Sequence, residues 1–345
     1  MNISSDFVVQ LLQFIGGLAI LIFIHELGQF VAARLVRVEV EEFGIGFPPR
    51  MTRLFVAGGT MFSLNWLPLG GFVRLKGEND PAEPGGFAAA SPYSRLVVLF
   101  AGPLMNISLG IVLAIILFYN LGEPILNQVV IQGISADSPA EAAGLQAGDL
   151  LLEVNQTPVQ STEDLQTMIL ANLGTPTELT YQRGDQIQTV TLVPRDPPPE
   201  DGAIGILMGN PSRPTTWMKA VPNGFTLAYQ YTRAVLALPV RALRGETTAE
   251  ERPLGYKGMF DIYQQIRNPL WFFMVISMSL GIFNLFPIPA LDGGRILFTL
   301  PEILLRRRVP PQYENVIHMV GFVVLIFLLI YINVQDFLNP IEFPR

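Results

Sequence analysis

The chain has 345 residues, of which 50% are hydrophobic and only 15% are charged. This composition lies outside the range of ordinary soluble domains and is typical of multi-span membrane proteins. The absence of cysteine excludes disulfides, thiolate catalysis and thiolate metal sites. The net charge is -7, and the basic residues form no stripe beyond the cluster at residues 306–308, so nucleic acid is not an expected partner.

Four apolar stretches are long enough to cross a hydrocarbon core of about 30 Å, which needs about 20 residues. The last three contain no charged residue. The first has no basic residue at its start and no small-residue cleavage signal at its end, so we expect a retained span and not a signal peptide. The four stretches are residues 7–33, 96–119, 269–291 and 315–335.

Basic residues concentrate in two short connections, and this predicts how the chain is oriented. The connection between the first two spans carries seven of them, and the connection between the last two carries Arg295 and the cluster at residues 306–308. Because basic loops remain in the cytoplasm, both connections are expected there, with the cluster acting as an anchor. The long insert between the second and third spans is then expected on the extracytoplasmic side.

The insert is expected to be a globular module and not membrane-spanning. Short apolar runs alternate with turn residues between residues 128 and 194, and Gly144 and Gly148 stand where a helix end and a tight turn need positive φ. Local patterns predict a half-buried strand, a helix start with N-cap chemistry and a hairpin turn. These three features lie at residues 149–155, 161–164 and 183–185.

This module resembles a PDZ domain in the permuted arrangement found in bacterial proteases, and we expect it to cover residues 121–200. A PDZ fold binds an extended peptide as an added strand at a sheet edge, so a peptide ligand is one expected partner. The alternative is a spacer or size filter without a ligand. In the connector that follows, the amphipathic stretch 217–243 is expected in the membrane interface, with a fifth span as the alternative.

Ionisable residues interrupt the first span, in the sequence FIHELGQFVAARL at residues 23–35. Charged groups are costly in hydrocarbon, so such residues are functional by default. In a His-Glu-x-x-His pattern, two imidazoles share a helix face and one metal ion, while the glutamate reaches the water beside it. His25 and Glu26 fit this design, but Gln29 stands where the second histidine is expected.

A further ligand has to come from elsewhere, and the candidate is Asp292 in the sequence NLFPIPALDGG at residues 284–294. Two prolines interrupt a helix there and two glycines free the backbone, so the carboxylate is expected at a broken helix end in or beside the bilayer. A metal ion shared with His25 is the simplest compensating charge. The alternative is that Asp292 caps the helix end through backbone N–H groups.

These two motifs, on separate spans with a PDZ-like module between them, resemble the site-2 protease family of intramembrane zinc metalloproteases. AGPLMN at residues 101–106 matches the family's second span, and FGIGFPPRM at residues 43–51 with LNWLPLGGFVRL at residues 64–75 matches its membrane-associated β loop. The resemblance covers nearly the whole chain and is closest to the four-span bacterial members of regulated intramembrane proteolysis.

The resemblance implies a multi-pass protein of the bacterial inner membrane, with zinc as cofactor and single-span transmembrane proteins as substrates. The expected fold class is a multi-span α-helical membrane protein with about four transmembrane helices, an inserted α+β PDZ domain and a membrane-associated β loop. The expected segments are the first span, the β loop, the second span, the PDZ domain, the connector, the third span and the C-terminal part. In that order they are residues 1–36, 37–95, 96–120, 121–200, 201–268, 269–294 and 295–345.

The resemblance also implies roles for individual residues. His25 and Asp292 are zinc ligands, Glu26 is the general base, and Asn284 helps to hold the substrate or the unwound segment. A strand edge within residues 60–75, which includes Gly70 and Gly71, would pair with an unwound substrate. The alternative for this stretch is that its PLGG sequence only turns the chain.

Gln29 is the departure from the family pattern, because an amide oxygen is a weaker zinc donor than an imidazole nitrogen. Both an engineered inactivating change and a variant that still holds metal remain open. The leading hypothesis is an intramembrane zinc endopeptidase, and the alternative is a catalytically inactive adaptor that binds peptides through its PDZ module. The other histidine, His318, is expected to face the headgroups or pack between helices, with a replacement ligand as the alternative.

Overall fold

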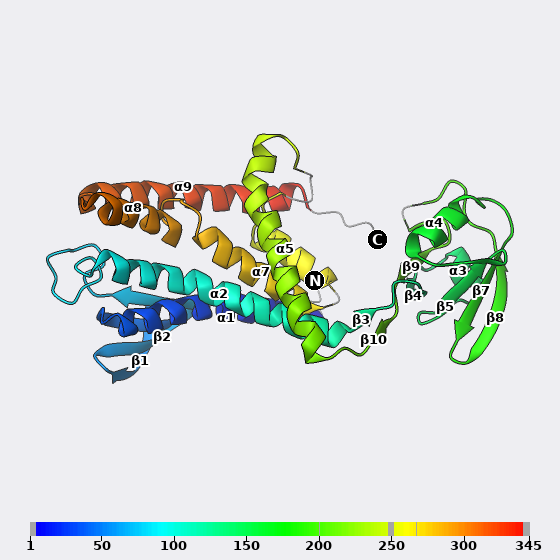
Figure 1. The fold of residues 1–345 in the computed structure, drawn as a ribbon, viewed down its shortest axis with the longest axis horizontal. Coiled ribbons are helices and arrows are strands. Elements are labelled where there is room, and N and C mark those ends of the chain that lie inside the picture. Colours follow the sequence, from blue (N-terminus) through cyan, green and yellow to red (C-terminus); the bar gives the residue numbers. More distant parts are fainter. Residues whose placement is uncertain (1–4, 200, 248–251, 267, 341–345) are drawn as a thin grey trace. The chain divides into compact units, whose positions relative to one another are not determined.

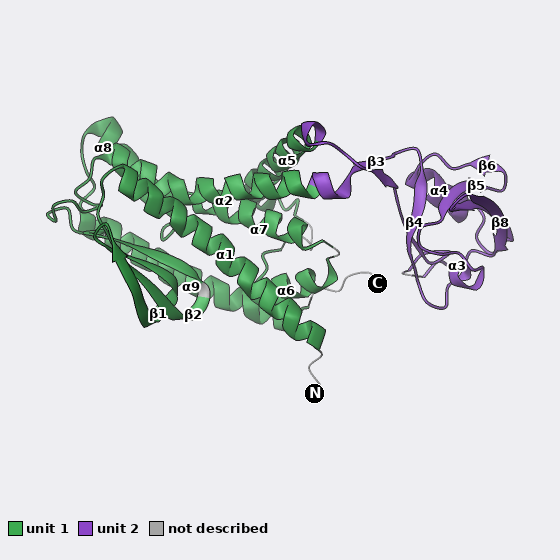
Figure 2. Ribbon diagram, turned by 90° about the horizontal axis from the view of Figure 1, so that it is seen from below, with its two compact units in different colours: residues 1–117, 220–341 green, residues 118–219, 342–345 purple. Residues whose placement is uncertain are grey.

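A computed structural model describes residues 5–199, 201–247, 252–266 and 268–340. Within these ranges the chain forms two compact units, which Figure 2 distinguishes by colour. Of the described residues, unit 1 combines 5–117 with those between 220 and 340, and unit 2 consists of 118–199 and 201–219. The inserted module is therefore a separate compact body, while the sequence segments on both sides of it form the helical unit.

The helical elements follow the apolar stretches of the sequence (Figure 1). In chain order they are α1 (Ser5–Leu35), α2 (Pro92–Leu121), α5 (Trp217–Leu243), α6 (Tyr256–Gln265), α7 (Pro269–Asn284), α8 (Asp292–Leu305) and α9 (Pro311–Leu338). In the described part of the chain, three helices are long and apolar enough to cross a membrane, namely α1, α2 and α9. They correspond to three of the four expected spans.

The remaining expected span, residues 269–291, forms a shorter helix than the sequence indicated. Helix α7 has 16 residues, which at 1.5 Å per residue corresponds to about 24 Å. The expected bounds of this span, 269–291, extend past the end of the helix. It ends at Asn284, because Pro287 and Pro289 cannot continue a helix, and α8 begins only at Asp292.

Helix α2 approaches both α1 and α7 closely. A Cβ atom on Gly28 of α1 would lie 2.6 Å from the carbonyl oxygen of Ala101, and one on Gly281 of α7 would lie 2.7 Å from that of Pro103. Side chains at these two positions would separate the helices. The glycines therefore bring α2 against the face of α1 that carries His25.

The segment after α1 forms a long hairpin of β1 (Val40–Ala57) and β2 (Thr60–Leu75). Residues 43–45 of β1 pair on one side with residues 71–73 and on the other with residues 62–64, so the hairpin folds back into a small curled sheet. The Phe43 ring packs 5.4 Å from the Phe23 ring of α1. This packing holds β2 beside the half of α1 that contains the His-Glu motif (Figure 1).

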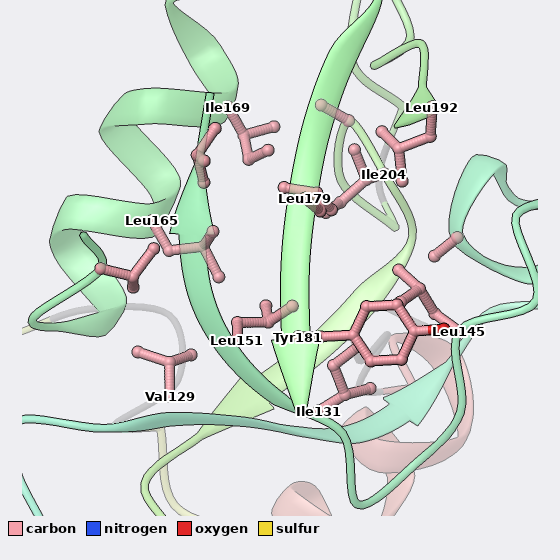
Figure 3. Close-up of a cluster of buried hydrophobic side chains, with 14 residues drawn as sticks. Val129, Ile131, Leu145, Leu151, Leu165, Ile169, Leu179, Tyr181, Leu192 and Ile204 are labelled. Atoms are coloured by element: carbon pink, nitrogen blue, oxygen red, sulfur yellow. The ribbon is translucent and has the colours of Figure 1, made fainter. Parts of the chain in front are cut away.

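Unit 2 is an α+β module built on a sheet with the strand order β8-β7-β5-β4-β9, in which β6 also pairs with β5. Figure 3 shows Leu165 and Ile169 of helix α4 packed over Leu151 and Leu179 of the strands. Strands β3 (Glu123–Pro124) and β10 (Ser212–Arg213) pair separately. The remaining elements are β4 (Val129–Ile134), α3 (Pro139–Ala142), β5 (Leu150–Val154), β6 (Thr157–Pro158), α4 (Thr162–Leu170), β7 (Thr177–Arg183), β8 (Gln186–Leu192) and β9 (Ile206–Gly209).

Local predictions for this module are confirmed, but its expected C-terminal boundary at residue 200 leaves out a strand of its sheet. Gly144 and Gly148 have φ values of 77° and 99°, and the Ser161 side chain accepts the N–H of Asp164 as an N-cap. Strand β9 lies beyond residue 200, in the expected connector, yet it pairs with β4 and forms one edge of the sheet. Pairing between strands so distant in the chain leaves no local periodic signal.

Helix α5 has the bounds of the amphipathic stretch in the sequence. Ala228 and Val235 pack on Met274, Met278 and Ile282 of α7, and α5 runs across α2 in Figure 1 and not along it. A narrow stripe of mostly small residues on the helix is thus buried on the bundle, while large hydrophobic side chains such as Phe225, Tyr229 and Leu236 remain exposed.

Buried Asp149 generates a prediction about the stability of unit 2. Burial raises its pKa, but hydrogen bonds from Arg183 and the Gln146 N–H outweigh burial and hold the pKa below its usual value. A carboxylate with a lowered folded pKa stabilises the fold above its unfolded pKa of about 3.9, and this stabilisation is lost as pH falls through the folded pKa. We expect Asp149→Asn to lower the melting temperature of residues 118–219 at pH 7 by at least about 4 °C.

Circular dichroism of that segment measures the effect, and the exposed hairpin residue Asp185 provides the matched control, Asp185→Asn. Asp149→Asn should also reduce the drop in melting temperature on acidification. An unchanged melting temperature at pH 7 would show that the Asp149–Arg183 pair does not stabilise the module.

Candidate metal centre

Three polar side chains from α1 and α8 converge in unit 1. His25 Nε2 lies 3.0 Å from Asp292 Oδ2, although the two residues are 267 positions apart. Gln29 Nε2 donates to Asp292 Oδ1 at 3.0 Å and lies 3.3 Å from His25 Nε2. One turn of α1 places His25 and Gln29 on the same face, and the broken helix brings Asp292 to that face.

The backbone directs the Asp292 carboxylate toward α1 and not onto its own helix end. The N-cap of α8 is Leu291, which makes no side-chain cap, and Asp292 is the first helical residue. Both carboxylate oxygens contact the polar side chains of α1. The cap hypothesis is therefore not supported by these contacts.

Helix α2 completes the surroundings of His25, and sequence reasoning missed this. Asn106 Nδ2 lies 3.4 Å from His25 Nδ1, and its backbone carbonyl accepts the Ser277 hydroxyl at 2.7 Å. A Cβ atom on Gly102 would lie only 2.4 Å from His25 Nε2. Both residues belong to the AGPLMN sequence, which was the available signal, but the pattern did not indicate which residue faces the histidine.

The polar groups around His25 are compatible with a bound cation. His25 Nε2 cannot both donate to Asp292 and accept from Gln29, so the protein alone does not satisfy both contacts as hydrogen bonds. Asn106 Oδ1 is buried and has no hydrogen-bond partner among the described residues. A cation on the Nε2 lone pair would place the proton on Nδ1, and a half-turn of the Asn106 amide would let Oδ1 accept it. The residues present therefore fit a bound metal ion.

The spacing of the three side chains fits the same conclusion. Donors about 2.0–2.1 Å from a tetrahedral ion lie about 3.3 Å from one another. The His25–Asp292 and His25–Gln29 contacts of 3.0 and 3.3 Å approach this spacing. Gln29 can take part after a half-turn of its amide, which exchanges nitrogen for oxygen at nearly the same position. No cluster of three or more His, Cys, Asp or Glu side chains suited to a metal occurs within the described ranges.

Strand β2 meets α1 beside the glutamate of the motif. The Val73 N–H donates to Glu26 Oε2 at 3.1 Å. A Cβ atom on Gly70 would lie 2.5 Å from the Ile22 side chain, and one on Gly71 would lie 2.9 Å from the carbonyl oxygen of Gly44. Gly70 thus allows the strand to lie against α1 and Gly71 allows it to lie against β1, and both glycines belong to β2 and not to a loop.

Two other residues of interest lie outside this cluster. Asn284 Nδ2 donates to the carbonyl oxygen of Leu280 in its own helix at 2.9 Å. His318 Nδ1 accepts the backbone N–H of Ala290 at 2.9 Å, in the turn that precedes Asp292. His318 thus packs against a neighbouring segment, as one of the expectations had it, and its contact is with a backbone amide.

The family model of peptidase family M50 matches residues 13–328, a range that includes every residue of the cluster. The chain belongs to this family, the site-2 protease family. A Clostridium perfringens protein named as a candidate zinc metalloprotease is 31% identical over 331 residues, covering 93% of this chain and 96% of that protein. Membership in this family and the three long apolar helices make the chain an integral membrane protein.

Two further relatives match over comparable lengths. A Rickettsia conorii protein, also named as a candidate zinc metalloprotease, is 30% identical over 361 residues, covering 96% of this chain and 99% of that protein. The zinc metalloprotease RasP of Oceanobacillus iheyensis is 25% identical over 422 residues, covering 94% of this chain and 97% of that protein. The similarity therefore extends over the helical unit and the inserted module.

The close approach of α2 generates a prediction about Gly102. Gly102→Ala should displace the His25 ring, because the new methyl group has no room and overpacking of this kind costs about 1–3 kcal/mol. Solid-state ¹⁵N spectra of histidine-labelled protein can follow the ring directly, since the chain contains two histidines. We expect the His25 signals to shift while those of His318 remain.

Gly110→Ala is the matched control on the same helix. Its Cβ would meet the flexible Met278 side chain at 2.6 Å, and that side chain can move aside. Unshifted His25 signals in Gly102→Ala would contradict the packing of α2 against this ring.

Proposed function

We propose that this protein has the architecture of an intramembrane zinc metalloendopeptidase that cleaves transmembrane segments of single-span proteins. The observation that carries the proposal is the convergence of His25, Gln29 and Asp292 within 3.0–3.3 Å, with Glu26 next in sequence to the histidine. Family membership and the zinc metalloproteases among its relatives support the same function. The family context adds that substrates lose an outer domain before this cleavage, as in regulated intramembrane proteolysis.

His25 Nε2 and the Asp292 carboxylate would hold the zinc ion, and Gln29 would add its amide oxygen after a half-turn. This set has one nitrogen and two oxygen donors, which zinc favours less than two imidazoles and a carboxylate. A bound zinc ion would supply Lewis acidity, which polarises the scissile carbonyl and makes water easier to deprotonate. Asn106 would orient the His25 ring by accepting its Nδ1 proton.

The remaining roles belong to Glu26 and strand β2. Glu26 would take a proton from the attacking water, and the Val73 N–H holds one of its two carboxylate oxygens in place. A substrate helix has to unwind before its carbonyls can be attacked, and the edge of β2 near Gly70 and Gly71 would bind the unwound segment as an added strand. Asn284, at the end of α7, would help to hold the unwound segment.

A second candidate function is an inactive adaptor, since Gln29 weakens the metal site. Unit 2 supports peptide binding, because β9 is an edge strand beside helix α4. A cavity of about 220 Å³ lies between these two elements and is lined by Leu165, Ile169 and Ile206 among others. We propose that unit 2 is a PDZ domain whose peptide ligand adds a strand to β9.

The proposed location is the bacterial inner membrane, with unit 2 on the extracytoplasmic side. The basic residues of the two short connections, including Arg306–Arg308, support this orientation because such loops remain in the cytoplasm. The proposed arrangement has four spans, with α7 as the short one, and α5 in the membrane interface.

Restoring the second histidine tests the proposed function. Gln29→His should raise zinc affinity by about 10-fold or more, because a histidine nitrogen is a better zinc donor than an amide oxygen. Zinc content of the purified protein and cleavage of a reconstituted single-span substrate measure the two effects. A further Asp292→Asn change should remove the gained zinc and the gained activity.

The wild-type result separates the two candidate functions. Activity of the wild-type chain with zinc bound favours the peptidase without restoration, while activity only after Gln29→His favours the adaptor for this chain. If Gln29→His neither binds zinc more tightly nor cleaves, the proposed metal site is wrong.

Single cysteines introduced into the cysteine-free chain test the orientation. Asp185→Cys marks the hairpin turn of unit 2, and Arg307→Cys marks the basic connection; both positions are exposed. A membrane-impermeant maleimide should label them from opposite sides of sealed vesicles. Labelling of both from the same side would overturn the orientation and favour a fifth span.

A further inference from the structure

The turn that presents Asp292 is held from outside by helix α9. The backbone N–H of Ala290 donates to His318 Nδ1 at 2.9 Å. One turn further along α9, a Cβ atom on Gly321 would lie 2.4 Å from Pro289 Cβ and 2.9 Å from the Pro289 carbonyl oxygen. Two positions of α9, spaced as neighbours on one helix face, therefore contact two consecutive residues of the turn.

The turn needs such support because its backbone is strained. Ala290 has a φ of 77°, a left-handed conformation that disfavours any residue with a Cβ atom. Residues in this region persist only where the surrounding structure over-determines them. Ala290 is two positions before Asp292, so a change in its φ would redirect the start of α8 and with it the carboxylate.

The inner side of the turn is packed too closely to absorb such a change in the backbone. A Cβ atom on Gly293 would lie 2.1 Å from the carbonyl oxygen of Phe286, and one on Gly294 would lie 2.4 Å from that of Ile288. The first turn of α8 is therefore packed directly against the turn that precedes it. Movement of the turn and movement of Asp292 are coupled through these backbone contacts.

The hydrogen bond to Ala290 also specifies the state of the His318 ring. A ring nitrogen accepts only when it carries no proton, so the proton of this neutral imidazole is on Nε2. The ring lies 5.6 Å from the Phe298 ring of α8, which holds it on the side of the turn. His318 is thus oriented for one acceptor contact, and that contact is the N–H of the strained residue.

We propose that His318 is a positioning residue, which holds the turn at residues 285–291 in the shape that presents Asp292 to His25 and Gln29. It does not touch the cluster itself but acts through the backbone of Ala290. Only the last consequence, an effect on zinc, rests on the proposed function. The geometry of Asp292 against His25 can be tested without any metal.

Two substitutions of similar size and polarity distinguish a role of His318 as a hydrogen-bond acceptor from a role in packing alone. The amide oxygen of asparagine can take the place of Nδ1, so His318→Asn keeps an acceptor for the Ala290 N–H. His318→Gln places its amide one bond further along the side chain, near the position of Nε2, and loses that acceptor. Each variant leaves His25 as the only histidine, so its ¹⁵N ring signals are unambiguous.

In metal-free protein, the Asp292→Asn variant shows where the His25 signals lie when the contact between Asp292 and His25 is lost. We expect His318→Gln to shift the His25 signals toward those positions. His318→Asn should keep the wild-type signals. Adding Ala290→Gly to His318→Gln should return the signals toward wild type, because glycine adopts positive φ without strain. In a Gln29→His background, His318→Gln should weaken zinc binding by about 10 to 100-fold.

Unchanged His25 signals in His318→Gln, or equal shifts in the asparagine and glutamine variants, would overturn the positioning role. Should His318→Gln not fold, Gly321→Ala decides, since its methyl group would push on Pro289 while His318 is kept. Unshifted His25 signals in that variant would also overturn the proposal. Shifted signals with unchanged zinc affinity would support the positioning role and overturn the ligand role of Asp292.

Discussion

The contact between Asp292 and His25 is the interaction on which the rest of the helical unit depends. It joins the start of α8 to the middle of α1 across 267 positions of sequence. A carboxylate and an imidazole in an apolar bundle are costly unless they compensate one another or share an ion. The break between α7 and α8 lies where the Asp292 carboxylate reaches α1.

The elements around this contact can be understood as its supports. Helix α2 approaches α1 so closely that only a glycine, Gly102, fits beside the His25 ring. The Asn106 side-chain amide of the same helix lies beside His25 Nδ1. Strand β2 supplies a backbone N–H to Glu26, and α9 supplies a ring nitrogen to the turn before Asp292. Each of these groups comes from a different part of the chain, so the site is assembled only when the whole unit folds.

Gln29 is the residue that separates the two functions proposed for this scaffold. Its amide lies within hydrogen-bonding distance of both neighbours, so the geometry of a three-donor site is retained. What changes is the strength of the donor, because an amide oxygen binds zinc less well than an imidazole nitrogen. In the proposed adaptor function, peptide binding by unit 2 does not require that donor.

The sequence by itself determined the membrane character and the inserted module, and it led to the expectation that His25 and Asp292 lie close together. The length of an apolar stretch indicates whether it partitions into the bilayer. Turn residues such as Gly144 and Gly148 indicate backbone conformations that depend on no distant segment of the chain. Only the tertiary structure decided that α7 ends at Asn284 and that β9 joins the sheet of unit 2. It also placed Asn106 beside His25, the Val73 N–H on Glu26, and His318 on the turn before Asp292. These features arise from close packing between segments distant in the chain, where the partner of each group depends on the positions of whole elements and leaves no periodic pattern in the residues themselves.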